Sequence, residues 1–261
     1  MPDFKDHFSR AAAEYSAFRP AYPDSLFEWL ATRTAGHDLA WDCATGNGQA
    51  ARGLARHYTE VVATDASAGQ LEHALVHPRI RYRVAAAEHS GLQDSTVDIV
   101  TVAQALHWLP LTPFFAEVQR VLAPGGLVAV WGYGLPTASS AGLDRELQRF
   151  YDAIVGPYWP PERRLVDEQY RTVHFPFVEI AVPPFAIEQP LTRRGLEGYL
   201  RTWSATQRYR SAHPNDDPLD QIAPVLAAAW PEPDDVRLVR WPMFMRAGRS
   251  QGARPSTGRK G

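Results

Sequence analysis

The sequence predicts an α/β fold built on a mostly parallel sheet, and residues 39–135 carry the evidence for it. Apolar residues gather in short runs that predict strands at Leu39–Cys43, Glu60–Thr64, Ile80–Val84, Val97–Val102 and Gly126–Trp131. Segments with helical spacing lie between them, including Gln49–His57, Gly69–Val76 and Pro113–Leu122. Because neighbouring parallel strands need a crossover connection, usually a helix, this alternation indicates βαβ units.

The segments on either side of this core are expected to cover it. Residues 1–38 predict two helices, separated by Pro20 and Pro23 because proline interrupts a continuous helix. Residues 136–247 predict helices at 140–155, 193–206 and 217–230 and late strands near Val173–Val182 and Val236–Met245. We therefore expect an N-terminal helical cap (1–38), a cofactor-binding α/β core (39–135), and a helical lid with the final strands of the same domain (136–247). Residues 248–261 have no apolar anchor and predict a disordered tail.

Composition excludes several classes of protein. The chain has 261 residues, of which 45% are hydrophobic and 21% charged, as in soluble globular proteins. A net charge of −2 gives no overall attraction to nucleic acid or to acidic membranes. Cys43 is the single cysteine, and neither a secretion signal nor a membrane-spanning apolar run is evident. These features predict a cytoplasmic protein, monomeric or homodimeric, that binds no metal, nucleic acid or membrane.

A glycine turn after the first predicted strand is the strongest sign of a ligand site. Asp42 ends the strand, and Gly46 and Gly48 then lead into a helical segment. Glycine has no Cβ, so the backbone of such a turn can approach a ligand closely. The pattern through Ala51 also fits a dinucleotide-binding loop. A carboxylate at Asp42 would repel a pyrophosphate and attract a cation, which favours the sulfonium of S-adenosylmethionine.

Asp65 is a second carboxylate at a strand end. It closes the next predicted strand, 23 positions after Asp42 (65 − 42 = 23). An acidic residue near this spacing accepts hydrogen bonds from ribose hydroxyls. Asp65 therefore supports an adenosine-containing ligand, and it fits a nicotinamide dinucleotide as well as S-adenosylmethionine.

Further motifs complete a resemblance. The first turn reads Asp42–Gly48, with Ala44 at a position usually occupied by glycine, and Asp65 lies within Thr64–Ser67. Ala86–Glu88 follows the third predicted strand, Asp98–Trp108 includes the fourth, and Leu122–Gly126 precedes the fifth. On these motifs the chain resembles the class I S-adenosylmethionine-dependent methyltransferases, with a methyltransferase type 11 domain, over residues 1–247. The Gln104–Trp108 segment and the Tyr15–Pro23 segment are similar to the trans-aconitate methyltransferase-like branch, some members of which esterify small carboxylic acids.

The resemblance implies a Rossmann-like fold. Its sheet would have seven strands, mostly parallel with the last antiparallel, helices on both faces, and N-terminal and inserted helices that form a lid. Ligands of such folds bind beyond the carboxyl ends of the strands. The resemblance thus implies S-adenosylmethionine as cofactor, held by Asp42, Ala44, Thr45, Gly46, Gly48, Asp65, Ala66, Ala87, Glu88, Gln104, Ala105 and Trp108. Ala44 adds one methyl group to the loop, which we expect to be tolerated.

The need for a general base depends on the acceptor. A carboxylate is already ionised near pH 7, whereas a hydroxyl, amine or activated carbon needs deprotonation. His107 is the candidate base because histidine titrates near neutrality. The alternative is that His107 packs beside Trp108 and makes only a hydrogen bond.

Acceptor recognition is expected from the aromatic segments outside the core. Candidate substrate and lid residues are Tyr15, Arg19, Tyr22, Trp203 and Tyr209. Arg19, Arg201 or Arg208 could hold an acidic acceptor by a bidentate contact. The alternative is that the aromatic residues of both segments only pack a core.

The predicted function is methyl transfer from S-adenosylmethionine to a small molecule such as a carboxylic acid, by in-line displacement. Within the same class, the alternative is O- or C-methylation of a hydroxylated or aromatic metabolite with His107 as base. Outside it, the alternatives are a NAD-dependent oxidoreductase and a non-catalytic binding protein on a methyltransferase fold.

Overall fold

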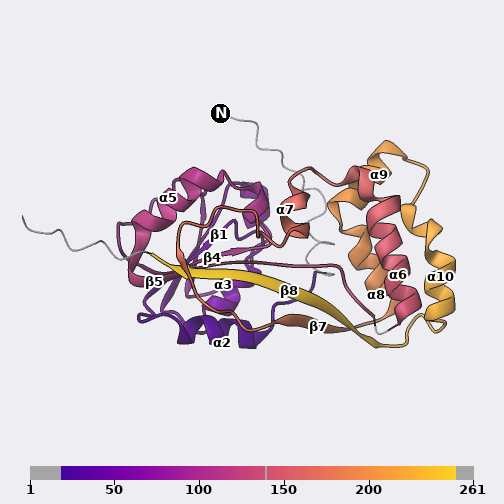
Figure 1. Cartoon of the computed structure of the whole chain (residues 1–261), viewed down its shortest axis with the longest axis horizontal. Coiled ribbons are helices and arrows are strands. Elements are labelled where there is room, and N and C mark those ends of the chain that lie inside the picture. Colours follow the sequence, from indigo (N-terminus) through magenta and orange to yellow (C-terminus); the bar gives the residue numbers. More distant parts are fainter. Residues whose placement is uncertain (1–18, 139, 251–261) are drawn as a thin grey trace, which may run out of the picture.

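The computed structural model describes residues 19–138 and 140–250. Figure 1 shows a twisted sheet flanked by helices in one half of the molecule. In the same figure, a cluster of helices lies beside the start of the last strand, β8 (Arg237–Arg249). The first of the two helices predicted within residues 1–38 falls largely among residues 1–18, outside the described residues. The second is α2 (Asp24–Thr32).

The sheet follows the order β3-β2-β1-β4-β5-β8-β6, and β7 pairs with β8 beside this path. Its strands are β1 (Leu39–Cys43), β2 (Glu60–Asp65), β3 (Ile80–Val84), β4 (Val97–Ala103), β5 (Leu122–Tyr133), β6 (Val178–Glu179), β7 (Ala186–Leu191) and β8 (Arg237–Arg249). β1 to β5 pair in parallel, and β8 runs antiparallel to β5. The expected seven-stranded, mostly parallel sheet with an antiparallel last strand is confirmed, and β7 adds a strand that was not predicted.

Helices cover both faces of the sheet and form a separate cluster near β7. After α2 they are α3 (Gln49–Leu54), α4 (Ala68–Leu71), α5 (Leu111–Val121), α6 (Ala141–Arg149), α7 (Arg163–Asp167), α8 (Arg193–Arg201), α9 (Ser204–Ala212) and α10 (Ala223–Ala229). Shorter turns are η2 (Leu106–Trp108), η4 (Gly156–Tyr158) and η5 (Pro218–Gln221), all 3₁₀, and η3 (Phe150–Ile154), which is a π-helix. None of the described helices has the length and apolar content to cross a membrane.

Alternation along the strands creates two cores, one on each face of the sheet. In β1, Trp41 packs toward α5, whereas Ala40 packs toward α2 and α3. This follows from the strand period of two, which points successive side chains to opposite faces. A third core joins α6, α8 and α10 to β7 and β8 around Trp230 and Trp241. The helical cluster is therefore packed onto the end of the sheet.

Several expected boundaries are wrong, and the helix expected at 193–206 is the clearest case. It is two helices, because Thr202 donates its hydroxyl to the carbonyl of Tyr199 at 2.6 Å and Trp203 adopts an extended backbone. A threonine hydroxyl that bonds the preceding turn competes with helix continuation. The helices expected at 140–155 and 217–230 likewise break into α6 with η3, and η5 with α10.

The expectation of a disordered tail from residue 248 is wrong for the first residues of that range. Gly248 and Arg249 belong to β8 and pair with both β5 and β6. Arg249 also donates hydrogen bonds to the carbonyl oxygens of Gly125 and Arg33. Backbone pairing and these side-chain bonds anchor the strand end without apolar residues. Residues 251–261 lie outside the described residues.

Candidate active site

The carboxyl ends of β1 and β4 meet at a buried carboxylate, that of Asp42. Its Oδ2 accepts a hydrogen bond from the Thr45 hydroxyl at 2.6 Å, and its Oδ1 accepts one from the Thr101 hydroxyl at 2.8 Å. Burial raises the pKa of Asp42 to about 6, while the hydrogen bonds from Thr45 and Thr101 oppose the rise. Asp42 is therefore held in one orientation and is mostly ionised at pH 7.

The turn after β1 has the backbone conformation that glycine favours. Gly46 and Gly48 have φ values of 57° and 86°. A Cβ on Gly48 would lie 2.3 Å from the hydroxyl oxygen of Tyr82, so no larger residue fits there. Ala44 is also left-handed, with φ of 54°. Ala44 therefore destabilises the fold through its backbone as well as by adding a methyl group, because a left-handed conformation costs an L-residue roughly 1–2 kcal/mol.

Asp65 ties the same turn to the end of β2. Its Oδ2 accepts a hydrogen bond from the backbone amide of Gly46 at 2.9 Å, and its Oδ1 accepts one from the amide of Ser67 at 2.9 Å. Each carboxylate oxygen can accept more than one hydrogen bond. The carboxylate of Asp65 is therefore oriented by the backbone and still suits ribose hydroxyls as donors.

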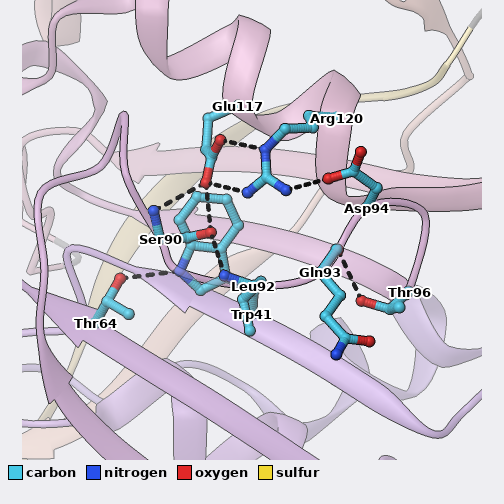
Figure 2. A network of polar contacts seen from close by, with 9 residues as sticks. All are labelled: Trp41, Thr64, Ser90, Leu92, Gln93, Asp94, Thr96, Glu117 and Arg120. Carbon is cyan, nitrogen blue, oxygen red and sulfur yellow. Dashed lines mark hydrogen bonds and ion pairs between the residues drawn. The ribbon is translucent and has the colours of Figure 1, made fainter.

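The loop after β3 is held by a polar network below it (Figure 2). Glu117 on α5 accepts hydrogen bonds at Oε1 from the Ser90 amide at 2.9 Å and from the Ser90 hydroxyl at 2.6 Å. Arg120 donates to both oxygens of Glu117, at 2.8 and 2.7 Å, and also pairs with Asp94. The pairing with Arg120 lowers the pKa of Glu117 to about 2. Glu88, a predicted cofactor residue, lies two positions before Ser90 and is half-buried.

A pocket of about 50 Å³ lies between the end of the sheet and the helical cluster. Aromatic side chains dominate its lining. The residues that face it are Arg19, Gln104, His107, Trp108, Tyr133, Gly134, Leu135, Tyr151, Trp159, Pro160, Arg163, Tyr199, Trp203 and Ser204. Apart from Arg19, which precedes α2, they come from the ends of β4 and β5 and from residues 151–163 and 199–204. The pocket therefore lies between the sheet and the helical cluster.

Gln104 has a strained backbone at the pocket edge. Its φ is 55°, and its side-chain Oε1 accepts a hydrogen bond from the Tyr133 amide at 3.1 Å. The backbone amide of Gln104 donates to the carbonyl oxygen of Trp131 at 2.8 Å. Left-handed non-glycine residues persist where surrounding bonds fix them, and they are common at functional sites.

His107 is nearly buried and electrically neutral. Its Nδ1 lies 3.2 Å from the Tyr170 hydroxyl, and its ring lies 4.7 Å from that of Trp108 between centroids. Burial lowers the pKa of His107 to about 3, and the positive charge of Arg163 adds to the effect. The alternative of a packed, hydrogen-bonded histidine beside Trp108 thus agrees with the geometry.

Two arginines in the pocket lining bond to tyrosine hydroxyls. Arg19 Nη1 donates to the Tyr133 hydroxyl at 2.9 Å, and Arg163 Nε donates to the Tyr151 hydroxyl at 2.8 Å. The Arg163 guanidinium also lies 4.7 Å from the ring centroid of Trp159 and 3.4 Å from Asp167. Its side chain is only 17% exposed. The pocket therefore combines positive charge with flat apolar walls.

Five of the site residues that the sequence predicts lie in the lining of this pocket: Arg19, Gln104, His107, Trp108 and Trp203. Two other candidate lid residues lie elsewhere: Tyr22 packs edge-on against Trp131, and Tyr209 donates to Asp216 at 2.6 Å. Tyr15 lies outside the described residues.

Neither of the other two candidate arginines faces the pocket. Arg201 pairs with Asp217 at 3.2 Å, and Arg208 is absent from the lining. The remaining predicted cofactor residues, among them Thr45, Ala66, Ala87 and Ala105, follow the carboxyl ends of β1 to β4.

Sequence reasoning missed the segment that supplies Tyr151, Trp159 and Arg163. Tyr151 lies in the π-helical turn η3, an irregularity often found at functional sites. The run from Tyr158 to Arg164 joins aromatic rings, two prolines and two arginines, and this composition is the available signal. The described residues contain no group of histidine, cysteine or acidic side chains that could hold a metal.

The fold is that of an α/β protein, and its strand-end carboxylates form a candidate nucleoside site beyond β1 and β2. Residues 41–130 match the family described as methyltransferase domain. A methyltransferase of Dictyostelium discoideum is 32% identical over 249 residues, which cover 93% of this chain and 94% of that protein. The chain belongs to the class I S-adenosylmethionine-dependent methyltransferases.

Two further comparisons agree with this assignment. A protein of Saccharomyces cerevisiae named as an S-adenosylmethionine-dependent methyltransferase is 30% identical over 134 residues, covering 48% of this chain and 46% of that protein. The solved structure of a type II methyltransferase from Anaeromyxobacter dehalogenans is 43% identical, with a TM-score of 0.84, and the match covers 89% of this chain and 98% of that one. The similarity to the trans-aconitate branch stays a prediction.

Proposed function

We propose that the enzyme methylates a carboxylate oxygen of a small organic acid bound in the pocket beside His107. The observation that carries the proposal is the placement of Arg163 and Arg19 among aromatic rings in that pocket. Arg19 donates to the Tyr133 hydroxyl, and Arg163 donates to the Tyr151 hydroxyl, which in turn donates to Asp167. Asp167 offsets part of the charge of Arg163 from 3.4 Å. The remaining positive field favours an anionic acceptor.

The residues at the strand ends fit S-adenosylmethionine. Gly46 leaves room for a ligand against the backbone, since only Gln70 Oε1 lies near the position of an added Cβ, at 3.7 Å, and the Asp65 carboxylate suits a ribose diol. The buried Asp42 places negative charge below the turn, where it attracts a cationic ligand. Ala44, Thr45, Ala66, Ala87, Glu88, Gln104, Ala105 and Trp108 would complete the cofactor site. When bound, the cofactor supplies an activated methyl group.

The chain's own residues then have to align the acceptor and exclude water. Arg163 and Arg19 would hold the acid, and the aromatic lining keeps solvent from the reacting oxygen. A carboxylate has a pKa near 4 in water and is ionised at pH 7, so no proton is removed. A lowered pKa of about 3 makes His107 a weak base. This disfavours the alternative in which His107 deprotonates a hydroxyl.

The test is methyl uptake from labelled S-adenosylmethionine by matched acceptors. We expect transfer to small unsaturated or aromatic acids and none to the corresponding alcohols and amides, with a rate that is constant between about pH 7 and 9, above the raised pKa of Asp42. Transfer to alcohols or phenols but not acids would contradict the proposal. Tight binding of NADH without binding of S-adenosylhomocysteine in calorimetry would contradict the cofactor assignment itself.

Variants at Arg163 sharpen this test. Arg163→Gln should raise the acceptor KM by ten- to a hundredfold, because a charge-assisted hydrogen bond contributes about 1.5–3 kcal/mol. The affinity for S-adenosylmethionine should not change. Arg164→Gln is the matched control, since the Arg164 side chain is 81% exposed and pairs with Glu168 outside the pocket. An equal effect of both variants would remove Arg163 from acceptor binding.

A further inference from the structure

His107 has one buried and one accessible ring nitrogen. Nδ1 lies 3.2 Å from the hydroxyl of Tyr170, and the two rings stack at an interplanar angle of 27°. Within residues 19–138 and 140–250, Nε2 has no hydrogen-bond partner and is not sealed from solvent. Because His107 lines the pocket, Nε2 is the nitrogen available to an acceptor.

Tyr170 is held in place from several sides. It is fully buried and follows α7, and both it and Gln169 have left-handed backbones with φ of 57° and 55°. Arg246 donates to the Tyr170 carbonyl at 2.9 Å and to the Val173 carbonyl at 2.7 Å. Two consecutive left-handed residues are strained, and such strain persists where surrounding contacts fix it. The Tyr170 hydroxyl is thereby directed at His107.

The direction of the hydrogen bond to Nδ1 follows from the burial of the hydroxyl. Tyr170 is fully buried, and within the described residues Nδ1 of His107 is the one hydrogen-bond partner of its hydroxyl. A buried O–H without an acceptor is costly. Burial raises the pKa of Tyr170 well above its usual value, so the hydroxyl keeps its proton. That proton is then left for Nδ1 of His107, which must accept it as an unprotonated nitrogen.

We propose that Tyr170 is a positioning residue that donates to Nδ1 of His107, keeps the imidazole proton on Nε2 and so turns His107 into a hydrogen-bond donor facing the acceptor pocket. Resting on the proposed function, this assigns to Nε2–H the carboxylate oxygen that is not methylated. The pocket then offers donors from Arg19, Arg163 and His107. A protonated amine in the same position would face two guanidinium charges and the Nε2–H donor, and would be rejected.

The first measurement needs no acceptor. Long-range ¹H–¹⁵N spectra of the labelled enzyme report which nitrogen of a histidine carries the proton, and His107→Gln identifies the resonances of His107 among the nine histidines. We expect a neutral imidazole protonated at Nε2 from about pH 5 to 9. Tyr170→Phe should give a mixture of the two tautomers.

Tyr58→Phe is the matched control. Tyr58 is equally buried and its hydroxyl bonds Thr34 at 2.9 Å, remote from His107. This variant should lower thermal stability as much as Tyr170→Phe while leaving the His107 spectrum unchanged. In turnover with an acid acceptor, Tyr170→Phe should raise the acceptor KM about tenfold, with kcat and the Kd for S-adenosylmethionine within about threefold of the parent.

The outcomes separate this inference from the proposed function. A parent enzyme with the proton on Nδ1, or with a tautomer mixture that Tyr170→Phe does not alter, overturns the role of Tyr170 for any acceptor. A pure Nε2–H tautomer lost in Tyr170→Phe supports the role even if no acid is methylated, in which case the proposed acceptor class alone fails.

Discussion

Removing the charge of Glu117 should destabilise the enzyme and loosen its cofactor loop. Glu117 is 8% exposed, and its oxygens receive hydrogen bonds from Ser90 and from Arg120 (Figure 2). In Glu117→Gln the amide keeps one acceptor oxygen for Ser90 but turns an NH₂ group toward the guanidinium of Arg120. The variant loses the ion pair and leaves Arg120 with Asp94 alone as a charged partner.

The magnitude follows from the pKa of Glu117. A fall from 4.5 to about 2 corresponds to about 3 kcal/mol at full strength, at about 1.36 kcal/mol per pKa unit. Because the Arg120 side chain is 36% exposed, solvent screening reduces this to about 2 kcal/mol. The melting temperature of Glu117→Gln should therefore fall by about 4–8 °C at pH 7.

The pH dependence has a definite sign. The folded pKa of Glu117 lies below the unfolded value, so its contribution is complete above about pH 4.5 and is lost as the pH falls toward 2. The difference in free energy of unfolding between the parent and Glu117→Gln should therefore narrow by more than half between about pH 6 and 3. Urea denaturation at several pH values measures it.

The matched control is Glu146→Gln. Glu146 pairs with Arg149 in the same i,i+3 arrangement on α6, at 2.6 Å. α6 belongs to the helical cluster, whereas the loop after β3 lies beside the sheet (Figure 1). Glu146→Gln should lower the free energy of unfolding by about 0.5 kcal/mol and leave the Kd for S-adenosylmethionine unchanged. Glu117→Gln should raise that Kd several-fold. Equal, pH-independent losses in both variants would refute the reasoning.

Two further predictions concern the glycine turn. Asp42→Asn should weaken the binding of S-adenosylmethionine about tenfold or more in calorimetry, because a fixed negative charge is lost. Asp98→Asn, at the opposite end of β4, is the control and should leave the affinity unchanged. Unchanged affinity in Asp42→Asn would refute the role of Asp42. Ala44→Gly should raise the free energy of unfolding by about 0.5–1 kcal/mol, because the relief of about 1–2 kcal/mol of left-handed strain exceeds the entropic cost of glycine. The control is Ala63→Gly, within β2, which should lower the free energy of unfolding. A destabilised Ala44→Gly would mean that the strain is not present.

The cofactor half of the molecule could be predicted because its signals are local. Strands buried on both faces are continuous apolar runs, and the bounds of β1 agree with the expectation to the residue. The bounds of β3 also agree, although β3 is an edge strand with mostly exposed side chains, because its apolar residues alternate with arginine. β1 and β2 each have an aspartate as the last or penultimate residue, and Asp42 and Asp65 therefore lie at the same carboxyl edge of the sheet. Parallel topology alone brings those ends together, without any knowledge of side-chain packing.

The acceptor half could not be predicted in the same way because its determinants are tertiary. The break after Arg201 depends on a hydrogen bond from Thr202 and on the packing of Trp203 against a ring from η3 and against Trp159, which follows η4. Arg163 looks like any surface arginine in a short helix until Trp159 and Tyr151 are placed beside it. Nothing in the local sequence states which aromatic residues share a pocket.

β8 joins the two halves, and its continuity bears on how the acceptor pocket is formed. Residues Arg237–Pro242 pair with β7 beside the helical cluster, and Met243–Arg249 pair with β5 in the sheet. Trp241 packs among the helices of the cluster, while Tyr133, opposite Met243, lines the pocket. A single hydrogen-bonded strand thus fixes the helical cluster to the sheet that carries the cofactor loops. Under the proposed function, strand register rather than a flexible linker would therefore set the spacing between acceptor and methyl donor, as in-line transfer requires.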